Sequence, residues 1–131
     1  MNYAKIVPLD VANGTGIRVS LFVSGCPHHC FNCFNQETWN ESYGQPYTKD
    51  TEDEVIKLLR HPHVRGLTLL GGEPFTIEHQ RILWPLIQRI KQELPQKDIW
   101  GYTGYLIDDL LPDGRAYCEI TTNILQHLDM L

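Results

Sequence analysis

Three of the chain's four cysteines lie close together, in a C-x₃-C-x₂-C run formed by Cys26, Cys30 and Cys33. Three thiolates at this spacing can bind three irons of a cubane iron–sulfur cluster and leave the fourth iron without a protein ligand. Clusters that only transfer electrons usually have four cysteine ligands. An open metal position is where a substrate can bind and react. The spacing therefore indicates a catalytic cluster held by one loop of the chain.

The same thiolates allow a second interpretation. His28, His29 or Cys118 could supply a fourth ligand and close a tetrahedral structural zinc site. The spacing alone leaves both metals open. A disulfide framework does not fit three cysteines so near one another, and in a reducing cell such clusters are usually metal ligands or redox groups.

The bulk properties exclude several other classes. A chain of 131 residues is expected to form one domain, about half the length of a closed (β/α)₈ barrel. The net charge of -5 gives no basic surface for nucleic acid. No apolar stretch approaches the ~20 residues of a membrane span. We therefore expect a cytoplasmic protein that binds neither nucleic acid nor membrane.

The hydrophobic pattern predicts alternating strands and helices. Strands are expected at 17–23, 67–70 and 98–102, and helices at about 51–60, 76–94, 106–111 and 120–126. Thr51 begins a predicted capping box, and Pro85 should kink its helix or mark the first turn of a new one. Strands that alternate with helices predict a parallel sheet with right-handed crossovers. In such sheets, ligands bind at the carboxyl ends of the strands.

Gly71-Gly72-Glu73-Pro74 follows the second predicted strand, as the cysteine loop follows the first. The two segments should therefore face the same edge of the sheet. Two glycines let a backbone pass close to a ligand, and Glu73 could accept a hydrogen bond from a cationic amine. Taken alone, the segment could also be a tight turn from strand to helix. Asn13-Gly14-Thr15-Gly16 lacks the Lys-Ser/Thr of a phosphate-binding loop and is interpreted as a turn.

Together the cysteine run and the 71–74 segment resemble the radical S-adenosylmethionine family, and within it the branch that activates glycyl-radical enzymes. The likeness runs through nearly the whole chain in the expected order, over residues 10–18, 21–26, 33–35, 38–39, 42–46, 69–74 and 97–105. Asn32 departs from the aromatic residue that many members have before the last cysteine.

The resemblance implies a 4Fe–4S cluster whose iron ligands are Cys26, Cys30 and Cys33, with S-adenosylmethionine chelating the unique iron. Asn32, Cys33 and Phe34 would lie beside the adenine. The methionine ammonium would be held, mostly through backbone groups, by Gly71, Gly72, Glu73 and Pro74. Thr103 and Gly104, after the third predicted strand, are weaker candidates for a ribose contact.

The resemblance also implies a reaction. One electron in the cluster would cleave S-adenosylmethionine to methionine and a 5′-deoxyadenosyl radical, which removes a hydrogen atom from a glycine of a partner enzyme. The implied partner is the large subunit of an anaerobic ribonucleotide reductase, with a flavodoxin or ferredoxin as electron donor. A different glycyl-radical enzyme, such as pyruvate formate-lyase, is the alternative target, and a non-enzymatic zinc-binding module is the alternative outside enzymes.

The implied fold is an incomplete, TIM-like α/β barrel, in which an open parallel sheet carries outer helices. We expect residues 1–131 to form a single domain of this type, without the C-terminal strand and tail with which the family continues.

Overall fold

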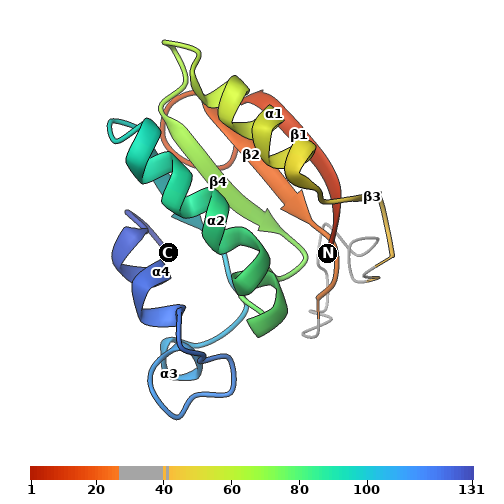
Figure 1. Ribbon diagram of the computed structural model, residues 1–131, viewed down its shortest axis with the longest axis vertical. Coiled ribbons are helices and arrows are strands. Elements are labelled where there is room, and N and C mark those ends of the chain that lie inside the picture. Colours follow the sequence, from red (N-terminus) through yellow and green to blue (C-terminus); the bar gives the residue numbers. More distant parts are fainter. Residues whose placement is uncertain (27–39, 41) are drawn as a thin grey trace.

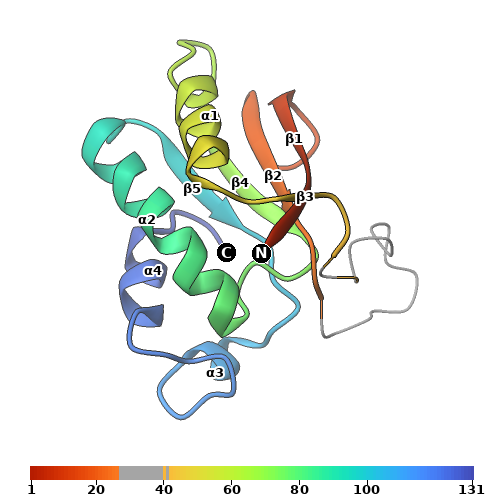
Figure 2. The same cartoon turned by 45° about the vertical axis from the view of Figure 1, so that its right-hand side comes forward.

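The computed structural model describes residues 1–26, 40 and 42–131, and these form an α/β fold around a five-stranded sheet (Figure 1). Helices α1 and α2 lie side by side on one face of the sheet, and α4 packs beside α2 (Figures 1 and 2). The elements are β1 (Asn2–Asp10), β2 (Arg18–Val23), β3 (Gln45–Pro46), α1 (Lys49–Leu59), β4 (Gly66–Gly71), α2 (Ile77–Glu93), β5 (Asp98–Gly101), α3 (Ile107–Leu110) and α4 (Thr121–His127).

The sheet is mixed, with strand order β3-β1-β2-β4-β5. Strands β2, β4 and β5 are parallel, as the sequence predicts. The prediction of a wholly parallel sheet is wrong, because β1 runs antiparallel to β2 and β3 runs antiparallel to β1. The physical reason is the short connection from β1 to β2, residues 11–17, which leaves no room for the crossover helix that a parallel pair needs.

The core lies between the sheet and helices α1 and α2. Strands β2 and β4 are buried along nearly their whole length, which is typical of central parallel strands with near-continuous apolar sequences. Apolar side chains from both layers fill this core, among them Leu21, Leu69, Leu86 and Ile90. The three strands predicted from the sequence are confirmed.

The predicted helices are also confirmed, with two adjustments at their ends. Helix α1 begins two residues earlier than predicted, because Thr48 is its N-cap and Thr51 its third residue. The Thr48 amide donates to Oγ1 of Thr51 at 3.1 Å, which reverses the role that the sequence suggested for Thr51. Helix α2 continues through Pro85, which lies on its exposed side, so no new helix starts there.

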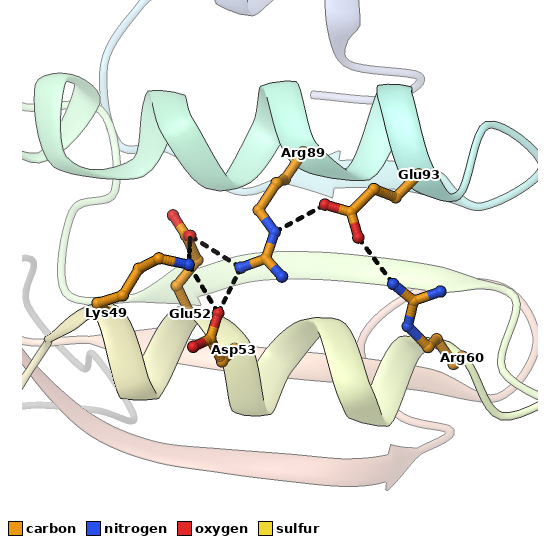
Figure 3. Close-up of polar contacts among 6 residues, drawn as sticks. All are labelled: Lys49, Glu52, Asp53, Arg60, Arg89 and Glu93. Atoms are coloured by element: carbon orange, nitrogen blue, oxygen red, sulfur yellow. Dashed lines mark hydrogen bonds and ion pairs between the residues drawn. The ribbon is translucent and has the colours of Figure 1, made fainter.

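Ion pairs join α1 and α2 where their polar faces meet (Figure 3). The Arg89 guanidinium contacts Glu52 at 3.0 Å and Asp53 at 2.6 Å on α1, and Glu93 at 2.8 Å on its own helix. Arg60, just after α1, contacts Glu93 at 2.7 Å. These contacts hold both helices over the same face of the sheet.

The start of β2 is closed by a fully buried arginine. Nε of Arg18 donates to Oγ1 of Thr68 at 2.7 Å, and Nη2 pairs with Asp98 at 2.7 Å. Residues 13–16 pass over this arginine as a turn, as predicted, and a Cβ on Gly14 would lie 2.6 Å from its Cδ. At the amino ends of the parallel strands, the buried polar groups are therefore paired with one another and covered by the 13–16 turn.

Beyond β5, the last residues of the chain lie along the edge of the sheet. The Asp129 amide donates to the Ile99 carbonyl at 2.8 Å, and Met130 forms a parallel bridge with Trp100. None of the helices in the described part of the chain is long and apolar enough to span a membrane.

Candidate functional site at the carboxyl edge of the sheet

The carboxyl ends of β2, β4 and β5 meet at one edge of the sheet, as predicted from the order of the motifs. Val23 pairs with Gly71 in register, and the arrows of β2 and β4 point to the same edge in Figure 1. The Gly72 amide donates to the Val23 carbonyl at 2.8 Å. The Glu73 amide donates to the Gly25 carbonyl, also at 2.8 Å. The segment that leads to the cysteines is thus joined directly to Gly71, Gly72, Glu73 and Pro74, called here the 71–74 turn.

Gly71 allows the 71–74 turn to approach β2 this closely. Its φ is 108°, in the region that favours glycine, and a Cβ there would lie 2.6 Å from the Val23 carbonyl oxygen. Any side chain at this position would push the two strand ends apart. The segment is therefore a tight turn, and it also brings main-chain groups to the edge where a ligand would bind.

A cavity of about 220 Å³ opens between the ends of β4 and β5. It is lined by Leu70, Gly71, Gly72, Tyr102, Thr103 and Gly104. Three of the six lining residues are glycines, so much of the wall is main chain. Such a wall suits a small polar group, such as an amino acid moiety, that is recognised by backbone amides and carbonyls.

Glu73 is completely buried, and its carboxylate joins two of the loops at this edge. Oε2 accepts hydrogen bonds from Thr103 Oγ1 at 2.8 Å and from the Phe75 amide at 2.9 Å. Oε1 accepts one from the Gly104 amide at 2.7 Å. Hydrogen bonds from these donors offset the cost of burying the carboxylate. They also fix the segment that follows β5, called here the β5 loop, against the 71–74 turn. That the carboxylate also contacts a cationic amine stays a prediction.

Two residues at the start of α2 hold the same segment from the other side. The His79 Nδ1 atom lies 2.7 Å from the Glu73 carbonyl oxygen, and Nε2 of Gln80 donates to the Phe75 carbonyl at 2.7 Å. Neither residue is predicted from the sequence. Polar residues on the buried side of an amphipathic helix carry no pattern that marks their role, apart from their place in the first turn after the N-cap Thr76.

Tyr105 lies half-buried next to this loop system. Burial, followed by the nearby Glu73 carboxylate, raises the pKa of its phenol above the usual value, although Arg115 opposes the effect. Asp109 and Cys26, when ionised, add smaller effects in the same direction. The phenol is therefore neutral at physiological pH.

The structure places only part of the predicted site. Cys26 is half-buried at the carboxyl edge, three residues beyond β2. The other predicted residues of the loop lie outside the described residues; they are Cys30, Asn32, Cys33 and Phe34, together with His28 and His29. Within the described part of the chain, no three His, Cys, Asp or Glu side chains are grouped to hold a metal ion. Cys118 is buried beside Thr121 and Gln80, between α2 and α4.

Comparisons with known proteins agree with these motifs. The family model described as "4Fe-4S single cluster domain" matches residues 12–131. The anaerobic ribonucleoside-triphosphate reductase-activating protein of Vibrio cholerae is 46% identical, over 100% of this chain and 81% of its own length. The protein of the same name from Escherichia coli K12 is 45% identical over 84% of this chain and 73% of its own. That of Enterobacteria phage T4 is 43% identical over 84% and 70%.

Proposed function

Because the chain belongs to the family of anaerobic ribonucleoside-triphosphate reductase-activating proteins, we propose that it generates a glycyl radical in an anaerobic ribonucleotide reductase. The observation that carries the proposal is the meeting of the 71–74 turn and the β5 loop around one cavity, with the segment that leads to Cys26 hydrogen-bonded to the same turn. A metal-bound cosubstrate would need the metal loop and the ligand turn to lie side by side in this way.

The proposed chemistry depends on two groups. When bound, a reduced 4Fe–4S cluster supplies one electron that breaks the sulfonium C–S bond of S-adenosylmethionine, giving methionine and a 5′-deoxyadenosyl radical that removes a hydrogen atom from a glycine Cα of the reductase. Cys26, Cys30 and Cys33 would hold three of the four irons, a donor set that suits iron–sulfur chemistry and leaves one iron for the cosubstrate.

The described residues fit this assignment. The cavity of about 220 Å³ suits the methionine part of the cosubstrate, and its glycine-rich wall presents main-chain groups to the ammonium and carboxylate. We assign this binding to Gly71, Gly72, Glu73 and Pro74, and the adenine contact to Asn32, Cys33 and Phe34. The contribution of the chain is to orient the sulfonium and to exclude water from it.

Some finer features belong to the same proposal. The three parallel strands and the helices on one face would be the described part of an incomplete TIM-like barrel, and residues 1–131 would form a single domain. The protein substrate would be the large subunit of the reductase, and a flavodoxin or ferredoxin would deliver the electron. We also propose that these proteins meet in the cytoplasm.

The first test is anaerobic reconstitution with iron and sulfide, followed by reduction and electron paramagnetic resonance spectroscopy with and without S-adenosylmethionine. The proposal predicts a reduced 4Fe–4S signal that changes when the cosubstrate is added. A cluster signal that does not change on addition of S-adenosylmethionine would contradict the proposal. Anaerobically purified protein that contains zinc and no iron would also contradict it.

The second test identifies the target. The reduced protein is mixed with S-adenosylmethionine and either an anaerobic ribonucleotide reductase or a pyruvate formate-lyase, and the glycyl radical is quantified by its resonance signal. We expect a radical in the reductase and none in the lyase. The opposite result would assign the chain to the alternative target.

A further inference from the structure

His79 is a buried imidazole that the proposed chemistry does not use. It is the third residue of α2 and is 1% exposed. Its Nδ1 atom lies 2.7 Å from the Glu73 carbonyl oxygen. A carbonyl oxygen can only accept a hydrogen bond, so Nδ1 carries the proton and donates it. The imidazole therefore acts on the backbone of the 71–74 turn.

With the His79 hydrogen bond, the amide, the carbonyl and the carboxylate of Glu73 each have a hydrogen-bond partner. The amide of Glu73 donates to Gly25, and the carboxylate accepts from Phe75, Thr103 and Gly104. The carbonyl is the group that His79 holds. Because the ring of Pro74 fixes the next φ angle, the orientation of this carbonyl largely sets the Glu73–Pro74 peptide plane. That plane directly follows Gly71 and Gly72, which line the cavity.

We infer that His79 is a positioning residue for S-adenosylmethionine binding, and that it acts by holding the Glu73 carbonyl in a single orientation. The inference rests on the proposed function. Without the Nδ1–H donor, the buried carbonyl loses this hydrogen bond and the turn can rotate. The backbone groups that would contact the methionine ammonium then spend part of the time in unsuitable positions, which lowers affinity without removing any atom that contacts the ligand.

Two substitutions separate the donor from the shape of the side chain. His79→Phe keeps a ring of similar size and removes the donor, whereas His79→Asn places an amide N–H near the position of Nδ1. In the anaerobically reconstituted protein, we expect His79→Phe to raise the Kd for S-adenosylmethionine about tenfold, which is the effect of one lost hydrogen bond. His79→Asn should remain within about threefold of the wild type, and both should retain the full iron content.

Lys97→Met is the matched control. Lys97 is also buried, at 7% exposure, and its Nζ atom donates to the Val64 carbonyl at 2.5 Å, at the amino end of the sheet. Loss of this bond should lower the Tm about as much as His79→Phe does and leave the Kd for S-adenosylmethionine unchanged. Hydrogen exchange provides a readout that needs no cosubstrate: the amides of residues 71–75 should exchange faster in His79→Phe and at the wild-type rate in Lys97→Met.

The outcomes distinguish this inference from the proposed function. If the wild type binds S-adenosylmethionine and His79→Phe binds it equally well, the inference is wrong and the proposed function stands. The inference is also wrong if Lys97→Met loses as much affinity as His79→Phe, because the effect would then follow stability alone. If the wild type does not bind S-adenosylmethionine, the proposed function fails.

Discussion

At Gly71 the backbone leaves β4 with a φ of 108° and lies against β2. Gly71→Ala would place a Cβ 2.6 Å from the Val23 carbonyl oxygen in a strained conformation, so we expect a loss of about 2–4 kcal/mol in unfolding free energy. Urea unfolding measures this change. Gly72→Ala is the matched control, since φ is not positive at Gly72, and it should cost below about 1 kcal/mol. Equal losses in the two variants would show that the close approach of the strands is not what requires glycine at position 71.

The four cysteines provide a second prediction at the scale of single residues. Replacing Cys26, Cys30 or Cys33 by Ala should remove the open-iron cluster and abolish reductive cleavage of S-adenosylmethionine, measured as 5′-deoxyadenosine formed under reducing conditions. Cys118→Ala should retain the cleavage, because Cys118 is buried against Thr121 and Gln80 between α2 and α4. Full activity in Cys30→Ala would refute the ligand assignment.

Among the secondary-structure elements, the ion pairs between α1 and α2 give a prediction that depends on salt and pH (Figure 3). A double-mutant cycle of Arg89→Met and Glu52→Gln should give a coupling of below about 1 kcal/mol that shrinks further in 1 M NaCl. Hydrogen bonds from Lys49 and Arg89 lower the pKa of Asp53, and a hydrogen bond from Arg89 lowers that of Glu93. The stabilisation from these carboxylates is therefore complete above their unfolded pKa values, and it is lost as the pH falls through the lowered values. Coupling that does not change with salt would contradict this account.

The same scale shows what the sequence could predict. The central strands β2 and β4 and the helix α2 were predictable because burial gives them long apolar runs or a clear helical period. Strand β1 was not predicted, because register shifts near Tyr3–Lys5 and Val7–Asp10 interrupt the alternation that marks a strand. Strand β3 has only two residues, too few to form a pattern.

In the candidate site, too, only some features could be predicted from the sequence. Cys26 and the 71–74 turn stood out as candidate site segments because clustered cysteines and paired glycines restrict a segment to a few kinds of chemistry. That the two segments lie at the same edge followed from the direction of the parallel strands. The contacts that fix the turn were not predictable. Glu73 reaches Thr103 across the gap between two strand ends, and His79 reaches back from the helix. Such contacts depend on tertiary distances that residue spacing does not encode.

In the molecule as a whole, the two ends of the parallel strands have different roles. The amino ends are closed by Arg18, which is fully buried, pairs with Asp98 and stacks 5.0 Å above the ring of Trp100. The carboxyl ends are open and carry the glycine-lined cavity. Stability and ligand binding should therefore respond to different substitutions, although both depend on the same three strands.

Arg18→Leu tests this separation. Removing the guanidinium leaves the Asp98 carboxylate without its closest partner and Thr68 without its donor, so we expect a loss of about 3 kcal/mol in unfolding free energy. Arg65→Leu is the matched control, because Arg65 also pairs with Asp98, at 3.6 Å, but its side chain is 64% exposed, and its loss should cost below about 1 kcal/mol. Under conditions in which both variants are fully folded, each should bind S-adenosylmethionine with the wild-type Kd, because neither substitution reaches the carboxyl edge. A folded Arg18→Leu variant with weakened binding would show that the amino end of the sheet also shapes the site, and the two ends would then have to be treated as one coupled unit.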